Sequence, residues 1–260
     1  MIDSHLHLDD SKLIGRVDEI YDAFEKNGIE FVINNSCDMP SMIKSVELAN
    51  RYDKVFATVG MHPHESKHFN QEFVSAMKQL ATNEKVVAVG EIGLDYFYDL
   101  SDRQIQRDVF AEQIEIADKL QLPITLHIRD AYGDAWDILT AQKKYLNNGV
   151  LWHCYSGSAE LARQAARLGH YFAFGGAITF KNAKKEDVFA QIPIERVLSE
   201  TDSPYMSPEP LRGRVNTPLN IPIIVNKMAS FYGVSVEQME AQIRDNALRF
   251  FPKIQKYFSK

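Results

Sequence analysis

The chain opens with MIDSHLHLDD (Met1–Asp10), a short strand-like run that passes at once into two histidines, His5 and His7. In an α/β protein, the residues after the first strand help to distinguish two architectures. A doubly wound dinucleotide-binding sheet would carry the glycine fingerprint GxGxxG at this place, whereas the sequence reads HLHLDD. The opening therefore favours the other common α/β arrangement, a barrel of alternating strands and helices.

Seven further segments rich in apolar and β-forming residues follow, and stretches with helical spacing separate them, as at 106–122 and 158–169. Nearly continuous apolar strands are typical of parallel sheets that are buried on both faces. Eight such units predict an α/β protein with a TIM (β/α)8 barrel, and a doubly wound sheet is the alternative. The seven segments are EFVINNSC (30–37), VFATVGMHP (55–63), VVAVGEIGL (86–94), PITLHIRDA (123–131), VLWHCYSG (150–157), YFAFGGAI (171–178) and VLSETDSP (197–204).

Length and composition are those of a globular protein, with 260 residues, 45% apolar and 25% charged. We expect a single domain over residues 1–260, with closing helices after about Asn220. No apolar run approaches the roughly 20 residues that cross a bilayer, and the N-terminus lacks the layout of a signal peptide. A cytoplasmic protein without membrane association is expected. Cys37 and Cys154 are too few for a disulfide framework.

The formal net charge is −6, which argues against a protein that coats nucleic acid through a broad basic surface. This charge is compatible with a local basic pocket. Bound metal ions can also supply the positive charge that a phosphate-handling site needs.

Potential metal ligands stand at six of the eight predicted strand ends. The carboxyl ends of barrel strands converge on one face, so residues far apart in the sequence become neighbours there. A lone buried histidine is usually a core residue, but repetition at successive strand ends favours metal binding. His5 and His7 are two residues apart and so face the same side of their strand. The predicted ligands are His5, His7, Glu91, His127, His153 and Asp202.

Four histidines and two carboxylates exceed the needs of one tetrahedral ion, so two divalent ions are predicted. Such a pair of ions generates a nucleophilic water and stabilises both oxygens of a phosphoryl transfer. The sequence thus indicates metal-assisted hydrolysis, with Glu91 and Asp202 as catalytic residues. The predicted partition gives His5, His7 and Asp202 to one ion and His127 and His153 to the other, with Glu91 and a water or hydroxide between them.

Other candidates have weaker signals. Arg129 follows His127 by two residues and would either bind a phosphate or pair with Glu200. Glu200 precedes Asp202 by two and would orient a ligand or assist proton transfer. Tyr96 and Tyr155 would either stack on a base or pack in the core.

Seven segments together resemble the TatD family of metal-dependent deoxyribonucleases, within the wider amidohydrolase-like group of barrels. EIGLDY and ETDSPY are the specific ones, since HxH is shared by many barrel hydrolases. The segments are DSHLHLDD at the start, GMHPHE (60–65), VVAVGEIGLDY (86–96), PITLHIRDA (123–131), HCYSG (153–157), LSETDSPY (198–205) and GRVNTP (213–218).

The resemblance implies a magnesium-dependent 3′-to-5′ exonuclease that acts on the ends of single-stranded DNA. No obligate protein partner is evident from the sequence. It implies the same six metal ligands that the strand ends indicate. It also implies that His62 contacts the scissile phosphate and that Arg214 belongs to a loop near the site.

Alternatives remain open at this point. The same binuclear site would serve a small-molecule esterase, lactonase or amidohydrolase, because a fold does not dictate its substrate. A non-catalytic protein in which metals only staple the barrel is a third possibility. The metal is also open among Mg, Mn and Zn, because the resemblance implies magnesium while imidazole-rich sites suit zinc or manganese.

Overall fold

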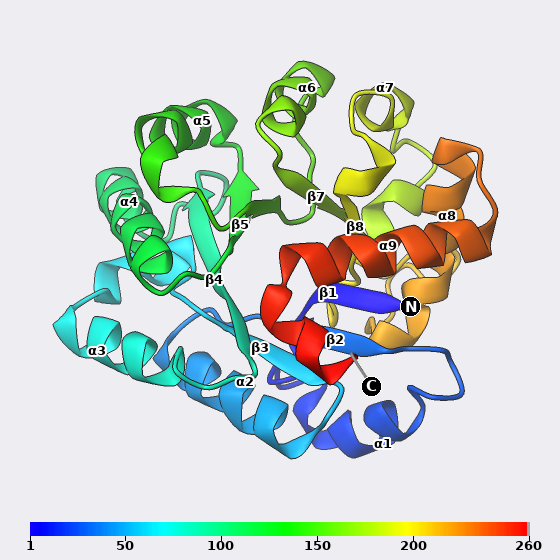
Figure 1. The fold of residues 1–260 in the computed structure, drawn as a ribbon, viewed down its shortest axis with the longest axis horizontal. Coiled ribbons are helices and arrows are strands. Elements are labelled where there is room, and N and C mark those ends of the chain that lie inside the picture. The colour runs from blue at the N-terminus through cyan, green and yellow to red at the C-terminus, as the bar shows by residue number, and fades with distance from the viewer. Residues whose placement is uncertain (259–260) are drawn as a thin grey trace. The chain divides into compact units, whose positions relative to one another are not determined.

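The computed structural model describes residues 1–258, in which strands and helices alternate along the chain (Figure 1). The strands begin where the sequence predicts them, and most of their residues are buried. They are β1 (Ile2–Leu6), β2 (Phe31–Asn34), β3 (Val55–Val59), β4 (Val86–Asp95), β5 (Ile124–Arg129), β6 (Val150–Trp152), β7 (Tyr171–Phe174) and β8 (Val197–Ser199).

Several helices between the strands begin at a residue whose side chain accepts hydrogen bonds from the first helical turn, as at Asp38, Asn70 and Asp102. The helices are α1 (Val17–Asp22), α2 (Met39–Arg51), α3 (Gln71–Leu80), α4 (Arg103–Lys119), α5 (Tyr132–Ala141), α6 (Ala159–Arg167), α7 (Glu186–Phe189), α8 (Ile221–Tyr232) and α9 (Val236–Phe250). Helices α8 and α9 confirm the closing helices expected after Asn220.

The strands form one sheet in the order β1 to β8, and every ladder described among residues 1–258 is parallel. The segment after β8 pairs with β1, since the Asp202 N–H donates to the His5 carbonyl at 2.9 Å and the His7 N–H donates to the Ser203 carbonyl at 2.8 Å. A parallel sheet in sequence order whose last strand adjoins its first is a (β/α)8 barrel. The predicted TIM barrel is confirmed, and the doubly wound alternative is wrong.

The described chain forms two compact units, which we treat separately. Unit 1 contains Met1–Asn34 and Cys154–Phe250, and therefore β1, β2, β7 and β8. Unit 2 contains Asn35–His153 and the described residues from Phe251 on, and therefore β3 to β6. A single domain over residues 1–260 stays a prediction.

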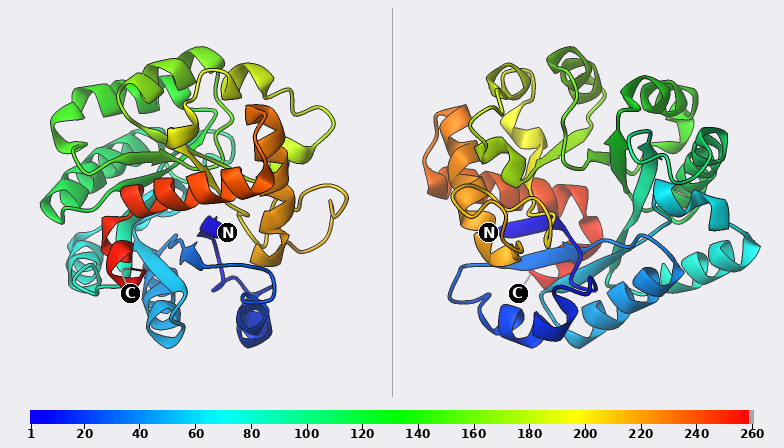
Figure 2. Two further views of the ribbon diagram at one scale, coloured as in Figure 1. Left: turned by 45° about the vertical axis from the view of Figure 1, so that its right-hand side comes forward. Right: turned by 180° about the vertical axis from the view of Figure 1, so that it is seen from behind.

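In unit 1, helix α9 packs against β1 and β8, as Figures 1 and 2 show. The buried Asn246 amide donates to the carbonyls of Ile194 and Val197, both at 2.8 Å. Tyr171 of β7 packs on Phe250 at the end of α9, with ring centroids 5.0 Å apart. These contacts fix the start of β8, and the strand leads directly to Glu200 and Asp202.

In unit 2, two buried glutamines of α4 fix the segments that follow β3 and the end of β4. Gln113 accepts from the Met61 N–H at 2.7 Å and donates to the Met61 carbonyl at 3.0 Å. Gln106 accepts from the Asp95 N–H at 2.9 Å and donates to its carbonyl at 3.2 Å. Helix α4 thus positions the backbone beside both His62 and Asp95.

Gly93 brings β4 and β5 together at the histidine that β5 carries. Its φ is +144°, and a Cβ there would lie only 2.1 Å from the His127 carbonyl oxygen. Only glycine fits this backbone and this contact. The glycine in EIGLDY therefore sets the distance between Glu91 on one strand and His127 on the other.

Candidate metal centre

Unit 1 carries three of the predicted ligands, His5, His7 and Asp202. His5 lies in β1 and is fully buried, and His7 follows that strand and is 8% exposed. The Nε2 atoms of His5 and His7 lie 4.0 and 3.6 Å from Asp202 Oδ1. The two imidazole rings meet edge to face, with centroids 5.1 Å apart. The structure thus brings both histidines to one carboxylate oxygen, as the period of two in HLH predicts.

A tight turn presents the Asp202 carboxylate. Asp202 has a φ of 55°, a left-handed conformation that is uncommon for a residue with a side chain. Its N–H donates to the His5 carbonyl at 2.9 Å, and its own carbonyl accepts from the Tyr205 N–H at 2.8 Å. Asn216 supports the turn by donating to the carbonyls of Thr201 and Tyr205. Backbone and amide contacts therefore hold the carboxylate beside the two histidines.

A buried carboxyl lies behind this set. Asp3 is fully buried and accepts from the N–H of Thr201 at 2.8 Å and from its hydroxyl at 2.5 Å. Burial raises the pKa of Asp3 to about 8, against the lowering effect of these hydrogen bonds. Asp3 therefore ties β1 to the segment after β8 mainly as a hydrogen-bonded carboxyl.

Glu200 is fully buried, and its Oε1 accepts from the Cys154 N–H at 2.7 Å. The predicted role of Glu200 in orienting a ligand or assisting proton transfer stays a prediction. Arg214 lies in an exposed loop, where its carbonyl accepts from the Ser207 hydroxyl at 2.7 Å. No described contact joins its guanidinium to the unit 1 ligands, and its role also stays a prediction.

In unit 2, three imidazoles surround one oxygen of the buried Glu91 side chain. Nδ1 of His127 lies 2.7 Å from Glu91 Oε1, and Nε2 of His62 and Nε2 of His153 each lie 3.8 Å from it. Glu91, His127 and His153 each offer a ligand atom, and these atoms lie within 4.8 Å of one another. The structure therefore brings the second predicted set together, with His62 beside it.

Asp95 is a residue of this cluster that the sequence reasoning missed. Its Oδ2 lies 2.9 Å from Nε2 of His127 and 2.9 Å from Nε2 of His64. Since Asp95 holds Nε2 of His127, Nδ1 is the nitrogen directed to Glu91, the arrangement of a carboxylate that orients a metal-binding histidine. The signal was its place four residues after Glu91 on β4, on the same face of the strand.

Charge and burial reinforce this arrangement. Burial opposes ionisation of Asp95, but hydrogen bonds from His127, His64 and the Tyr98 N–H outweigh it and hold its pKa well below the usual range. Burial also opposes protonation of His127, but Asp95 and Glu91 outweigh it and raise the pKa of the imidazole. The Asp95 carboxylate and the His127 imidazole thus each favour the charged form of the other.

The donor sets fit divalent metal ions. Metal–nitrogen bonds of about 2.0–2.1 Å in a tetrahedral site place neighbouring donors about 3.3 Å apart. The unit 1 separations of 3.6 and 4.0 Å and the 3.8 Å separations around Glu91 are close to this value. The 2.7 Å contact of His127 with Glu91 would have to widen slightly to admit an ion. Imidazole and carboxylate donors of this kind suit zinc and manganese.

Arg129 ends β5 and is exposed, and its guanidinium carbon lies 3.9 Å from the ring centroid of Phe97 and 4.8 Å from that of Tyr98. Its predicted pairing with Glu200 and its predicted contact with phosphate both stay predictions. Tyr155 is 2% exposed and packs on Phe172, so the core reading of this tyrosine is correct.

Tyr96, the other tyrosine considered for base stacking, is engaged by its neighbours. Its hydroxyl donates to Asp134 at 2.6 Å, and Arg103 lies over its ring at 4.5 Å. The side chain therefore holds together the loop after β4 and the start of α5.

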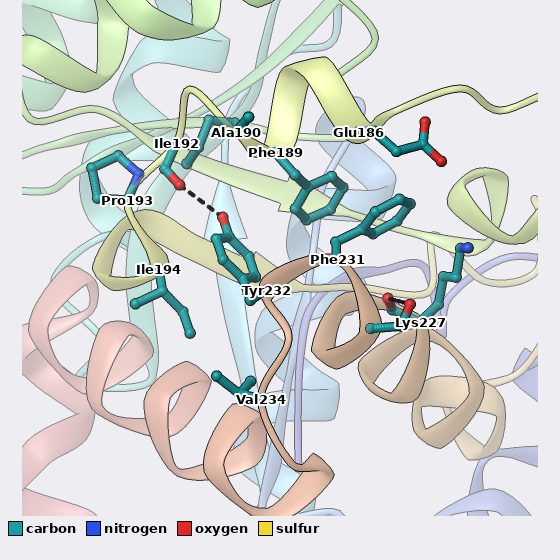
Figure 3. A pocket seen from close by; sticks show the side chains of 11 residues that line it. Glu186, Phe189, Ala190, Ile192, Pro193, Ile194, Lys227, Phe231, Tyr232 and Val234 are labelled. Atoms are coloured by element: carbon teal, nitrogen blue, oxygen red, sulfur yellow. Dashed lines mark hydrogen bonds between the residues drawn. The ribbon is translucent and has the colours of Figure 1, made fainter.

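A separate cavity of about 660 Å³ lies in unit 1 between α7 and α8 (Figure 3). Phe189 and Phe231 stack within it with ring centroids 4.3 Å apart, and the Tyr232 hydroxyl donates to the Ile192 carbonyl at 2.9 Å. None of the candidate ligands lines this cavity, so it is not the metal centre.

A (β/α)8 barrel whose strand ends present buried histidines and carboxylates at metal-ligand spacing defines the class of the protein, a metal-dependent hydrolase. The chain belongs to the TatD-related DNase family, whose model matches residues 2–252.

Relatives of this family match the chain almost end to end. An uncharacterized metal-dependent hydrolase of Bacillus subtilis, YabD, is 35% identical over 96% of this chain and 98% of its own length. The 3′-5′ ssDNA/RNA exonuclease TatD of Cronobacter sakazakii is 31% identical over 97% of this chain and 98% of its own. The crystal structure of YJJV, a TatD homolog from Escherichia coli, has a TM-score of 0.90 at 27% identity, covering 97% of this chain and 98% of that one. Among residues 1–258, no helix has both the length and the apolar character of a membrane span.

Proposed function

We propose that the protein is a 3′-to-5′ exonuclease that removes nucleotides from the ends of single-stranded DNA with the help of two divalent metal ions. Family membership and the activity named for the Cronobacter relative support the proposal. The observation that carries it is the Glu91 cluster, in which three imidazoles face one buried carboxylate oxygen and Asp95 fixes one of them.

The proposed ligands form two sets, one in each unit. Bound divalent ions would lower the pKa of a water molecule and stabilise negative charge on phosphate oxygens. Glu91 as the ligand shared by both ions stays a prediction from the sequence. The sets are His5, His7 and Asp202 in unit 1 and Glu91, His127 and His153 in unit 2.

The catalytic roles fall to Asp202 and Glu91. In the proposed reaction, water attacks the phosphorus, the P–O bond to the leaving sugar oxygen breaks, and that oxygen takes up a proton from solvent. Asp202 is the proposed acceptor of the proton that the water loses, because it is the more accessible of the two carboxylates. Glu91 is 3% exposed and is better suited to holding its histidines in place.

Three residues are proposed to bind the substrate. His62 is buried beside Glu91, and its Nδ1 accepts from the His64 N–H at 3.2 Å, so Nε2 carries the proton and is a donor for a phosphate oxygen. Arg129 and Arg214 are exposed cations that can contact the strand's phosphates. A protein that binds a strand end needs only a few phosphate contacts. A few exposed cations are therefore sufficient, even with a net charge of −6.

The working metal is part of the proposal. The donor chemistry favours zinc or manganese for affinity, whereas the family resemblance implies magnesium. We expect the purified protein to retain a zinc-like ion, and we expect activity not to follow affinity from metal to metal. A cytoplasmic location stays a prediction from the sequence.

The test is a time course of metal-stripped protein that is resupplied with magnesium, manganese or zinc, on single-stranded DNA labelled at its 5′ end. We expect a ladder that shortens from the 3′ end, and we expect none with Asp202→Asn, which removes the charge and preserves the volume. A ladder that is unchanged in the variant would overturn the assignment of Asp202. DNA that stays intact under every metal would overturn the exonuclease and favour a small-molecule esterase, lactonase or amidohydrolase.

A further inference from the structure

The loop between β4 and α4 exposes two neighbouring aromatic rings. Phe97 is 55% exposed and Tyr98 is 53% exposed. Single exposed apolar residues are ordinary, but two adjacent exposed aromatic rings beside a site indicate a binding surface. The proposed metal binding and hydrolysis do not involve these two rings.

The two rings are held in place by a residue of the candidate metal centre. Oδ1 of Asp95 accepts from the N–H groups of Phe97 and Tyr98 at 3.0 and 2.8 Å, while its Oδ2 engages His127 and His64. One buried carboxylate thus fixes both the imidazoles and the backbone under the rings. The rings stand at 89° to each other with centroids 5.0 Å apart.

A cation lies over the same rings. The guanidinium carbon of Arg129 is 3.9 Å from the centroid of Phe97 and 4.8 Å from that of Tyr98. An arginine stacked in this way keeps its N–H groups in its plane, where they can reach a phosphate. Both rings stay more than half exposed with Arg129 in place, so it leaves ring surface open.

The rings are continuous with the Glu91 cluster. Tyr98 meets His64 edge to face at 5.3 Å, and His64 meets His62 at 4.3 Å. His62 Nε2 is 3.8 Å from Glu91 Oε1. Only His64 and His62 therefore separate a molecule that lies on Tyr98 from the Glu91 carboxylate.

We propose that Phe97 and Tyr98, backed by Arg129, form a stacking platform for a nucleobase of the bound strand near its 3′ end. This inference rests on the proposed function. Aromatic rings take any base, because every base has a π-face, and the nearby guanidinium matches the phosphate that each nucleotide carries. A protein partner bound to these rings would lie where the substrate enters the site. A nucleobase of the substrate is therefore the occupant that fits best.

The test compares Phe97→Ala and Tyr98→Ala with the wild type on metal-loaded protein. Single-stranded DNA carries 2-aminopurine at one of the last three positions, and phosphorothioate linkages at its 3′ end keep it from being cleaved. Stacking quenches 2-aminopurine, and we expect quenching at one position in the wild type and its loss in the alanine variants. On ordinary DNA, KM should rise about 5- to 150-fold with little change in kcat, the range reported by alanine substitution at stacked bases.

Two variants serve as controls. Tyr98→Phe keeps the ring and should behave as the wild type. Leu100→Ala removes an equally exposed apolar side chain from the same loop and should change neither quenching nor KM. Urea unfolding of each variant checks that the alanine substitutions leave the fold intact.

The outcomes separate this inference from the proposed function. A wild type that neither binds nor cleaves DNA overturns both. A wild type that cleaves DNA, with alanine variants that keep the same quenching and KM, overturns the stacking platform alone. A change of oligomeric state in the alanine variants with unchanged KM would likewise overturn it and assign the rings to a contact between copies of this chain.

Discussion

The single carboxylate of Asp95 makes several of the hydrogen bonds that hold the Glu91 cluster and the loop after it in unit 2. It holds Nε2 of His127, Nε2 of His64 and the backbone of the two residues that follow it. Carboxylates in this position raise the basicity of a metal-binding imidazole and fix its ring. At the residue scale, this one side chain orients two imidazoles and the backbone that follows it.

Asp95→Asn should weaken metal binding and activity about 10- to 100-fold, the usual cost of losing an orienting carboxylate. The amide keeps the volume and one acceptor oxygen, so the fold should survive. Titration of metal-stripped protein with zinc, followed by kcat at saturating metal, checks this. Glu65→Gln changes a half-exposed acid on the same unit; it is the control and should leave both quantities unchanged. Normal metal affinity in the Asp95 variant would contradict the role of this carboxylate.

His170 makes stability depend on pH. It is buried, and burial lowers its pKa from 6.5 to about 4. Above about pH 6.5 the imidazole is neutral in both states, and its burial has no cost. As the pH falls toward 4, the unfolded state binds a proton that the native state does not, so the free energy of unfolding falls by up to about 3 kcal/mol.

His170→Gln should remove this part of the acid sensitivity. Urea unfolding in EDTA near neutral pH and again about two units lower gives the loss of stability for each protein. We expect the wild type to lose about 2 kcal/mol more than the variant. Equal losses in the two proteins would show that His170 does not titrate in this range.

At the scale of elements, the strand starts were predictable because buried parallel strands are nearly continuous apolar runs. The positions at which the strands end were harder to predict. β4 continues to Asp95, so an acid that looked like a loop residue is the last residue of a strand. β3 stops at Val59, and His62 instead precedes a 3-10 helix that begins at Pro63.

The grouping of the candidate ligands could be predicted because most of them lie near or just beyond the carboxyl end of a strand, where a barrel presents its site. Glu91 lies four residues before the end of β4. The orientation of each imidazole could not be predicted from the sequence. It depends on which ring nitrogen meets which carboxylate, as in the contacts of His127 with Asp95 and Glu91. Hydrophobic periodicity contains no information on such contacts, and so Asp95 and the exposed rings of Phe97 and Tyr98 were missed.

Gly93→Ala tests how closely β4 and β5 must approach. The new Cβ would lie 2.1 Å from the His127 carbonyl oxygen at a backbone angle that alanine avoids. We expect a loss of about 2–4 kcal/mol in the free energy of unfolding, from backbone strain and overpacking. Gly133→Ala is the matched control, because nothing lies within 4 Å of its Cβ and it stands in α5. Helix propensity predicts that this control is neutral or up to about 1 kcal/mol more stable.

At the scale of the whole molecule, charge limits how the protein can hold a strand. With a net charge of −6, we expect few phosphate contacts, chiefly those of Arg129 and Arg214. Two contacts predict a slope of log K against log salt of about −1.4 for single-stranded DNA, and Arg129→Gln should reduce its magnitude by about 0.7. Fluorescence anisotropy at several salt concentrations measures it. A slope several-fold steeper would show a basic track that the proposal lacks.

In the proposed centre, each unit supplies a ligand set for one ion. Elemental analysis of metal-loaded protein after gel filtration, for wild type, His7→Ala and His153→Ala, tests this arrangement. We expect two ions per chain in the wild type and about one in each variant, since each substitution removes a ligand from a different set. Fewer than two ions in the wild type, or variants that retain both, would contradict it.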